Sequence, residues 1–196
     1  MKLCKFKNVE RLLINIDMVN GFVYTGAMHD ERIARIIEPQ LELMKKCNRD
    51  EDMVVFVREG HRENATEFDK FPKHCVKGTY EAEIVDGLKE VAKDSKIYEK
   101  NSTSAIFAKD FLNDITKMIN LKEVILMGCC TDICVMNLAI PLMNYFDELN
   151  RNVKVIVPKN VVETYDAPTH NANDYNDMAF AFMEQAGIQV IDEYER

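Results

Sequence analysis

VILMGCCTDICV, at residues 124–135, joins a short apolar run to a helical pattern through a tight turn. The run at 124–127 is apolar on both faces, which is typical of a strand buried inside a parallel sheet. The helical period begins at Ile133 and continues to Leu149. This stretch therefore predicts a strand, a turn and a helix in direct succession, which is the basic unit of an α/β fold.

The same alternation of strand and helix extends along the whole chain. Short apolar runs predict strands at 12–16, 53–57, 96–98, 124–127 and 153–157, with a last one near 189–191. Helical patterns lie between them at 31–46, 81–93, 108–119, 133–149 and 173–186. We therefore predict right-handed βαβ units in a three-layer α/β/α sandwich, with a Rossmann-like, mainly parallel sheet of about six strands. No internal repeat or linker interrupts the pattern, which predicts one domain over residues 1–196.

The composition restricts the expected binding partners of the protein and its expected cellular compartment. The chain has 196 residues, with 25 Lys and Arg against 33 Asp and Glu, and a formal net charge of −8. This balance argues against a nucleic-acid partner, because phosphate contacts need clustered Lys and Arg. We find neither a secretory signal nor an apolar stretch long enough for a bilayer, so we expect no membrane association and a cytoplasmic location. The six cysteines are then expected to be free, catalytic or metal-linked rather than paired in disulfides.

Three polar residues follow predicted strands and are candidates for catalysis. Cys134 falls in the first turn of a helix, where the helix N-terminus favours a thiolate and an oxyanion. Asp17 directly follows the run at 12–16, and a charge at a buried strand end is costly unless it is paired or functional. Lys100 follows the run at 96–98. Simpler interpretations are a small buried apolar cysteine, a turn or N-cap aspartate and a solvated lysine.

A long loop carries a second group of candidate residues. The segment from Glu59 to Thr79 has little periodicity and is rich in charge, His, Pro and Gly. A loop of this length inside a compact domain is usually functional. Its two imidazoles and two carboxylates form a ligand set suited to zinc, manganese or iron, and they belong to Glu59, His61, Glu67 and His74. The alternative is a solvated, charged loop with no ligand.

Taken together, these segments resemble the isochorismatase-like cysteine hydrolases, and within that family the nicotinamidases. The matching segments are LINIDMVNGF at 13–22, EGH at 59–61, FPKHCVKGT at 71–79, Lys100 followed by Ser104 and Ala105, and GCCTDICV at 128–135. Their order and spacing cover nearly the whole chain, and the Thr-Asp-x-Cys-Val segment is highly specific.

The resemblance implies a catalytic triad of Asp17, Lys100 and Cys134. Cys134 would attack a carboxamide carbonyl and form a thioester, with Asp17 as the base. Lys100 would hold the carboxylate and the thiolate in register. The resemblance also implies a non-proline cis peptide bond between Cys129 and Cys130. The backbone N–H groups of Cys130 and Cys134 would then form the oxyanion hole.

The nicotinamidase branch adds a divalent metal ion that takes the pyridine nitrogen of the substrate. The implied ligands are Glu59, His61, Glu67 and His74, and the expected metal is zinc, with manganese or iron as alternatives. Glu59 stands where the family usually has Asp, and Thr103 stands where nicotinamidases often carry an aromatic residue. Phe22 and Phe71 are therefore the residues expected to stack on a flat substrate ring.

The resulting prediction is a metal-dependent nicotinamidase that converts nicotinamide and water to nicotinate and ammonia for NAD salvage. Its partner would be a small carboxamide, and the resemblance implies a homo-oligomer because relatives with this fold commonly assemble. Two alternatives stay open: a hydrolase of the same family acting on another small amide or on isochorismate, and a non-catalytic metal- or redox-binding protein. Near the last helix, we expect Thr169 to be the N-cap and His170 to be a cap or interface residue.

Overall fold

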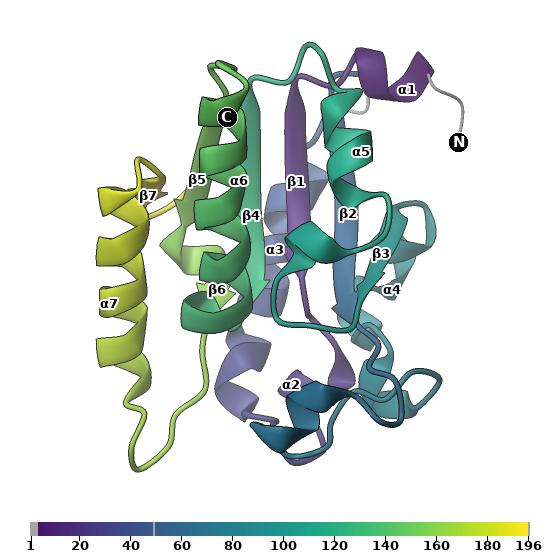
Figure 1. Cartoon of the computed structure of the whole chain (residues 1–196), viewed down its shortest axis with the longest axis vertical. Helices are drawn as coiled ribbons and strands as arrows, with labels where there is room; N and C mark the ends of the chain where they lie inside the picture. The colour runs from purple at the N-terminus through teal and green to yellow at the C-terminus, as the bar shows by residue number, and fades with distance from the viewer. Residues whose placement is uncertain (1–3, 49, 196) are drawn as a thin grey trace.

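The computed structural model describes residues 4–48 and 50–195, and a parallel sheet forms its centre (Figure 1). The strands are β1 Arg11–Ile16, β2 Asp52–Glu59, β3 Lys96–Lys100, β4 Glu123–Cys129, β5 Lys154–Pro158, β6 Val162–Glu163 and β7 Gln189–Ile191. They run in the order β3-β2-β1-β4-β5-β7, and β6 pairs with the end of β4. Each of these strand pairs is parallel, which confirms the predicted fold class.

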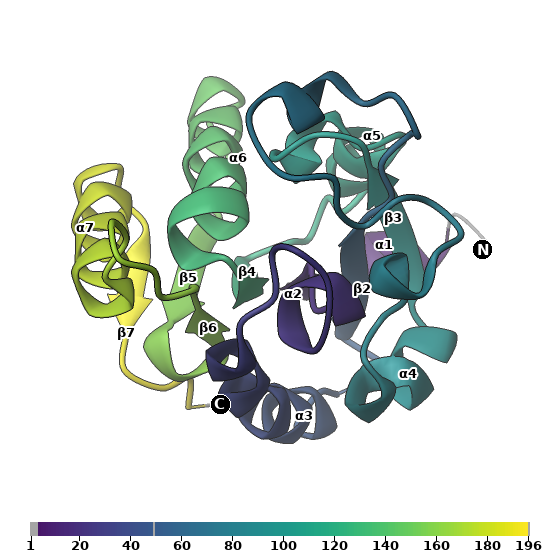
Figure 2. The ribbon, with the colours of Figure 1, turned by 90° about the horizontal axis from the view of Figure 1, so that it is seen from below.

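Helices cover both faces of the sheet and make it the middle of three layers (Figure 2). One face carries α1 Cys4–Lys7, α5 Phe111–Thr116, α6 Met136–Glu148 and α7 Ala172–Gln185. The other face carries α2 Asn20–Val23, α3 Ile37–Lys45 and α4 Asp86–Lys93. Short turns of 3-10 or π geometry join these elements: η1 Glu31–Ile36, η2 Thr66–Asp69, η3 Tyr80–Ala82, η4 Ala105–Phe107, η5 Thr131–Val135 and η6 Lys159–Val161. Two apolar clusters, one on each face, form the core.

Two of the expected helices become α-helical five or more residues later than their sequence patterns suggest. The pattern at 31–46 forms η1 and then α3, and Pro39 lies in the first turn of α3 because it has no N–H to bond back to residue 35. The pattern at 81–93 becomes α-helical only at Asp86. The residues before it pair with the chain after β1 instead, since Val85 N donates to the Met18 carbonyl at 3.1 Å.

The N-terminus of α7 differs from the prediction. Asn171, and not Thr169, is the N-cap, because its side-chain oxygen accepts hydrogen bonds from the backbone N–H groups of Asn173 and Asp174, both at 3.1 Å. His170 is therefore not the cap either. Its side chain points back toward the turn that carries Cys134 and contacts Asp132.

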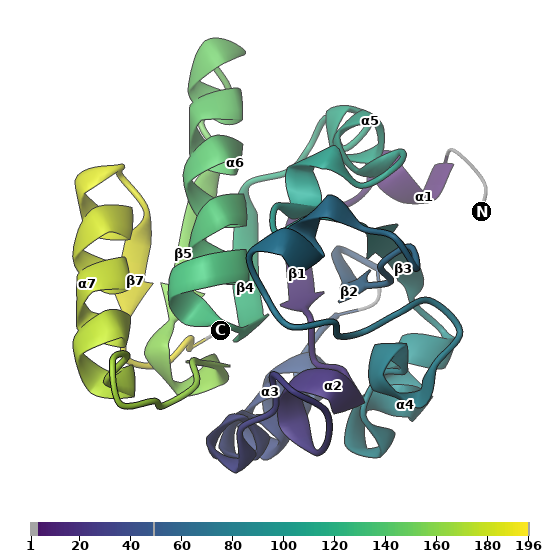
Figure 3. The ribbon, with the colours of Figure 1, turned by 60° about the horizontal axis from the view of Figure 1, so that its bottom comes forward.

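The sheet order sets the place of the site. β1 and β4 are neighbours in the sheet, and the chain leaves them toward opposite faces, which makes the gap beyond their carboxyl ends the topological switch point. Figure 3 brings this edge forward and shows the loop after β2 lying across it. Among the helices of residues 4–48 and 50–195, none has both the length and the apolar character needed to cross a bilayer.

Candidate active site

Four neighbouring strands deliver four functional side chains to the same edge. Asp17 follows β1, Glu59 ends β2, Lys100 ends β3, and Cys134 lies in η5 just after β4. Glu59 and Lys100 are register partners across the pair of β2 and β3. All four side chains are almost completely buried, so each charge among them depends on its neighbours for stabilisation.

The backbone beside Cys134 has two unusual features, a cis peptide bond and a glycine with positive φ. The peptide bond between Cys129 and Cys130 is cis, as the family resemblance implied. Gly128 has φ 131°, and a side-chain carbon there would lie 2.0 Å from the Ile16 carbonyl oxygen. Only glycine permits this approach, which brings the turn after β4 against the end of β1.

Lys100 is the electrostatic centre of the site. Its Nζ lies 2.9 Å from Asp17 Oδ2, 2.6 Å from Glu59 Oε1 and 3.7 Å from Cys134 Sγ. Burial favours the neutral amine, but Asp17, Cys134 and Glu59 outweigh it and raise the pKa of Lys100 well above 10.5. The side chain therefore remains an ammonium that compensates two carboxylates.

Asp17 and Cys134 are suited to exchange a proton. Burial raises the pKa of Asp17 to about 6, with Lys100 lowering it and Glu59 raising it further. Burial also raises the pKa of Cys134 well above 9, and the nearby ammonium of Lys100 only partly opposes this. These pKa shifts favour a carboxylate on Asp17 and a thiol on Cys134 in the resting site. For the pKa of Cys134, burial therefore outweighs any lowering by the helix N-terminus.

A second cluster shares Glu59 with the first. Glu59 Oε2 lies 3.1 Å from His61 Nε2 and 3.0 Å from His74 Nε2, and ligand atoms of the three residues lie within 4.8 Å of one another. His74 Nδ1 donates to the Pro72 carbonyl at 2.7 Å, which orients its Nε2 toward the cluster. His61 Nδ1 is buried with no hydrogen-bond partner in the described part of the chain. Two imidazole nitrogens and a carboxylate oxygen fit a divalent metal ion, and the cluster is a buried candidate metal site.

Glu67 lies apart from this cluster. Its carboxylate accepts a hydrogen bond from Thr103 Oγ1 at 2.9 Å and is not one of the three groups whose ligand atoms converge. It lines the same cavity as Glu59 and His74. The role of Glu67 as a metal ligand therefore stays a prediction.

A cavity of about 360 Å³, measured out to its open mouth, connects the two clusters. It is lined by Phe22, Met28, Glu59, Glu67, Phe71, His74, Cys130, Ile133, Cys134 and Tyr165. Phe22 and Phe71 were expected to bind a ring, and both lie on the wall, with ring centroids 5.6 Å and 6.4 Å from that of His74. Met28, Ile133 and Tyr165 carry no chemical signal in the sequence, and only the fold brings them here.

The other cysteines have structural contacts. The Cys129 thiol donates to the Asp17 carbonyl at 3.2 Å, and the Cys75 thiol contacts the Glu81 carbonyl at 3.8 Å. The thiols of Cys75, Cys129, Cys130 and Cys134 are free, and the Cys47 thiol contacts the Leu43 carbonyl at 3.9 Å.

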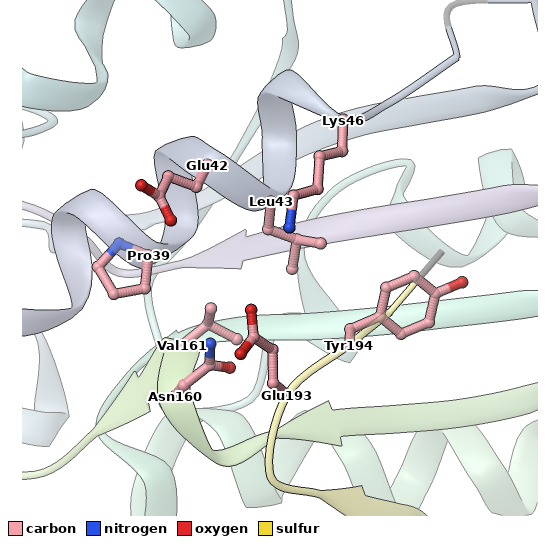
Figure 4. Close-up of a pocket in the computed structure, with 8 residues that line it drawn as sticks. All are labelled: Pro39, Glu42, Leu43, Lys46, Asn160, Val161, Glu193 and Tyr194. Carbon is pink, nitrogen blue, oxygen red and sulfur yellow. The ribbon is translucent and has the colours of Figure 1, made fainter.

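A second hollow, of about 250 Å³, lies between α3, η6 and the chain after β7 (Figure 4). Its lining residues are Pro39, Glu42, Leu43, Lys46, Asn160, Val161, Glu193 and Tyr194. None of them lines the cavity at Cys134, so this hollow is separate from the candidate active site.

A thiol paired with a buried carboxylate and ammonium, at the switch point of a parallel α/β sheet, is the arrangement of a cysteine hydrolase. Residues 11–194 match the Isochorismatase domain, and the chain belongs to the isochorismatase-like cysteine hydrolase family. It is 27% identical to Nicotinamidase 1 of Arabidopsis thaliana, over 83% of this chain and 72% of that protein.

Solved structures give the same family relationship. The nicotinamidase of Bacillus subtilis superposes with a TM-score of 0.77 at 26% identity, over 93% of this chain and 99% of that chain. The pyrazinamidase of Pyrococcus horikoshii, solved in complex with zinc, superposes with a TM-score of 0.73 at 26% identity, over 93% of this chain and 98% of that chain.

Proposed function

We propose that this hydrolase is a metal-dependent nicotinamidase, which converts nicotinamide and water to nicotinate and ammonia. The observation that carries the proposal is one cavity whose wall includes Cys134, which contacts Lys100, together with Glu59 and His74 of the candidate metal cluster. The Asp17–Lys100–Cys134 group supplies amide hydrolysis, and the metal cluster supplies a site for a ring nitrogen. The relatives named nicotinamidase and the zinc-bound pyrazinamidase support this combination.

The chemistry proceeds in two halves. Asp17 takes the thiol proton of Cys134, and Sγ attacks the carboxamide carbon to give a tetrahedral adduct. Protonated Asp17 gives its proton to the amide nitrogen, the C–N bond breaks, ammonia leaves and a thioester remains. Asp17 next takes a proton from water, whose oxygen attacks the thioester carbon. The C–S bond then breaks to release nicotinate, and the sulfur takes back the proton.

Lys100 and the backbone stabilise the charges that develop. The Lys100 ammonium lies within reach of both the base and the sulfur, so it stabilises the thiolate once the proton has moved. We assign the oxyanion hole to the backbone N–H groups of Cys130 and Cys134, and the position of both residues on the cavity wall supports this assignment.

The metal cluster has a positioning role in this proposal. Glu59, His61 and His74, with Glu67 as the further predicted ligand, would hold a divalent ion that supplies a Lewis-acid site for the ring nitrogen. Zinc is the proposed ion, with manganese and iron as alternatives. Phe22 and Phe71 would flank the ring. The proposal also includes one hydrolase domain over residues 1–196, a homo-oligomeric assembly, a role in NAD salvage and a cytoplasmic location.

Ammonia release from nicotinamide by the purified, metal-loaded protein tests this function. We expect turnover by the wild type, none by Cys134→Ala, and wild-type turnover by the matched control Cys47→Ala, whose thiol lies outside the cavity. A metal-loaded wild type that releases no ammonia from nicotinamide contradicts the substrate assignment. Turnover of another small carboxamide or of isochorismate in the same panel would identify the alternative substrate. No turnover and no reactive cysteine would favour the non-catalytic alternative.

A further inference from the structure

His170 forms the centre of a three-ring stack beside the cavity. Its imidazole lies between the rings of Tyr165 and Tyr175, with centroid separations of 3.9 Å and 3.7 Å and interplanar angles of 9° and 28°. The side chain is buried, although the loop between β6 and α7 that carries it is largely exposed. A histidine with aromatic rings on both faces is held in one orientation.

Both ring nitrogens of His170 face hydrogen-bond acceptors. Nε2 lies 2.9 Å from Asp132 Oδ2, and Nδ1 lies 3.0 Å from the Tyr165 carbonyl oxygen. Each ring nitrogen is thus within hydrogen-bond distance of an oxygen on a different part of the chain. The other oxygen of Asp132 accepts a hydrogen bond from Thr164 Oγ1 at 2.5 Å. Asp132 is thus held from two sides.

These contacts reach two parts of the cavity. Asp132 belongs to η5, the turn that presents Cys134, and Ile133 between them is a lining residue. Tyr165 is also a lining residue of this cavity. One imidazole therefore contacts both the turn that carries the nucleophile and a side chain of the substrate cavity.

We propose that His170 is a positioning residue of this hydrolase, with two separable effects. Its hydrogen bond to Asp132 fixes the turn that aims Cys134 at the carbonyl carbon. Its stack against Tyr165 fixes the wall on which a bound substrate rests. The proposal rests on the proposed hydrolytic function at Cys134, and it assigns His170 no contact with the reacting atoms.

Two substitutions separate these effects. His170→Phe keeps a flat ring between the tyrosines but removes both hydrogen bonds, so we expect kcat for nicotinamide to fall about tenfold or more, with KM little changed. His170→Gln keeps a donor near Asp132 but removes the stack, so we expect KM to rise about two- to tenfold, with a smaller effect on kcat. His29→Phe replaces an exposed histidine that does not line the cavity and should leave both constants unchanged.

A second measurement needs no substrate and separates this proposal from the proposed function. The rate of Cys134 alkylation by iodoacetamide is followed on the Cys134 peptide by mass spectrometry. Because the thiol is buried, a loosened turn in His170→Phe should speed its alkylation several-fold while kcat falls. If the wild type hydrolyses no nicotinamide, the proposed function fails and the alkylation rates alone decide the positioning role.

Folding is checked by circular dichroism and thermal unfolding. Wild-type kcat, KM and alkylation rate in folded His170→Phe would overturn the proposal. Identical kinetic losses in His170→Phe and His170→Gln that scale with the unfolded fraction would overturn it as well, because they indicate a merely structural side chain. The expected result is the opposite split between kcat and KM in the two variants.

Discussion

Replacing Lys100 by methionine tests whether one buried ammonium holds the active site together. Its Nζ lies 2.9 Å from Asp17 Oδ2 and 2.6 Å from Glu59 Oε1, and all three side chains are no more than 2% exposed. Methionine is similar in length and keeps the volume filled, but it leaves two carboxylates facing each other without a counter-charge. We therefore expect activity and stability to fall together.

The distances from Lys100 Nζ to the two carboxylates determine the expected loss in the free energy of unfolding. At an effective dielectric constant of about 20, each of the two pairs has a Coulomb energy of about 6 kcal/mol, and the desolvation of three charges offsets a large part of it. Removing one partner of a buried pair costs about 3–5 kcal/mol, and we expect a loss of that size in the free energy of unfolding at neutral pH. Adding Asp17→Asn removes one uncompensated charge, so the double variant should regain part of the stability and remain inactive.

Urea unfolding at fixed metal content measures these free energies, and ammonia release measures the activity. Lys122→Met is the matched control, since that ammonium pairs with Glu10 on the surface and is mostly exposed. The control should leave the free energy of unfolding nearly unchanged. The reasoning is refuted if Lys100→Met costs no more than the control, or if the double variant is less stable than the single one.

Three further predictions concern pH, metal and stability. kcat/KM should fall as the pH drops through about 6, because the proposed base Asp17 has a raised pKa and must be ionised to act. A flat profile of kcat/KM from pH 5 to 8 would contradict this role of Asp17. His61→Ala and His74→Ala should each lower the amount of bound metal measured by elemental analysis. Chelation of the wild type should abolish turnover, and added zinc should restore it. Full activity in the chelated protein would contradict the role of the metal. Asp114→Asn should lower the free energy of unfolding by about 1–3 kcal/mol at pH 7. Burial alone would raise the pKa of Asp114, but hydrogen bonds from Lys117, Lys96 and Tyr98 lower it below 3.8. Its contribution is then fully present above pH 3.8 and is lost as the pH falls through the folded-state pKa, so the difference from wild type should vanish in acid; a constant difference would contradict this.

The central sheet could be predicted because its strands leave strong local signals, whereas the triad was implied by the family resemblance. Most strands contain an apolar run, and Asp17 directly follows the run in β1, whereas Lys100 ends the short strand KIYEK after Glu99. A parallel sheet gathers its carboxyl ends on one edge, so residues far apart in sequence meet there. β6 was not predicted, because a strand of two residues, Val162–Glu163, is too short to show a periodic pattern in the sequence.

Other features depend on tertiary contacts that no local pattern encodes. The raised pKa of Cys134 follows from its burial beside two carboxylates, which outweighs the effect of its position in a helical turn. Tyr165 reaches the cavity because the chain after β6 turns back beside η5. Thr169 is a good N-cap by residue type, but the geometry of the loop gives that place to Asn171.

The most direct test of the central claim is whether a covalent intermediate forms on Cys134. Turnover of nicotinamide is followed in the presence of hydroxylamine, a nucleophile about as small as water that can intercept a thioester. The account predicts that nicotinohydroxamate forms at the expense of nicotinate while ammonia release continues, and that Cys134→Ala forms neither product. Ammonia release with no hydroxamate at any hydroxylamine concentration, or hydroxamate formation by Cys134→Ala, would contradict a thioester mechanism at this residue.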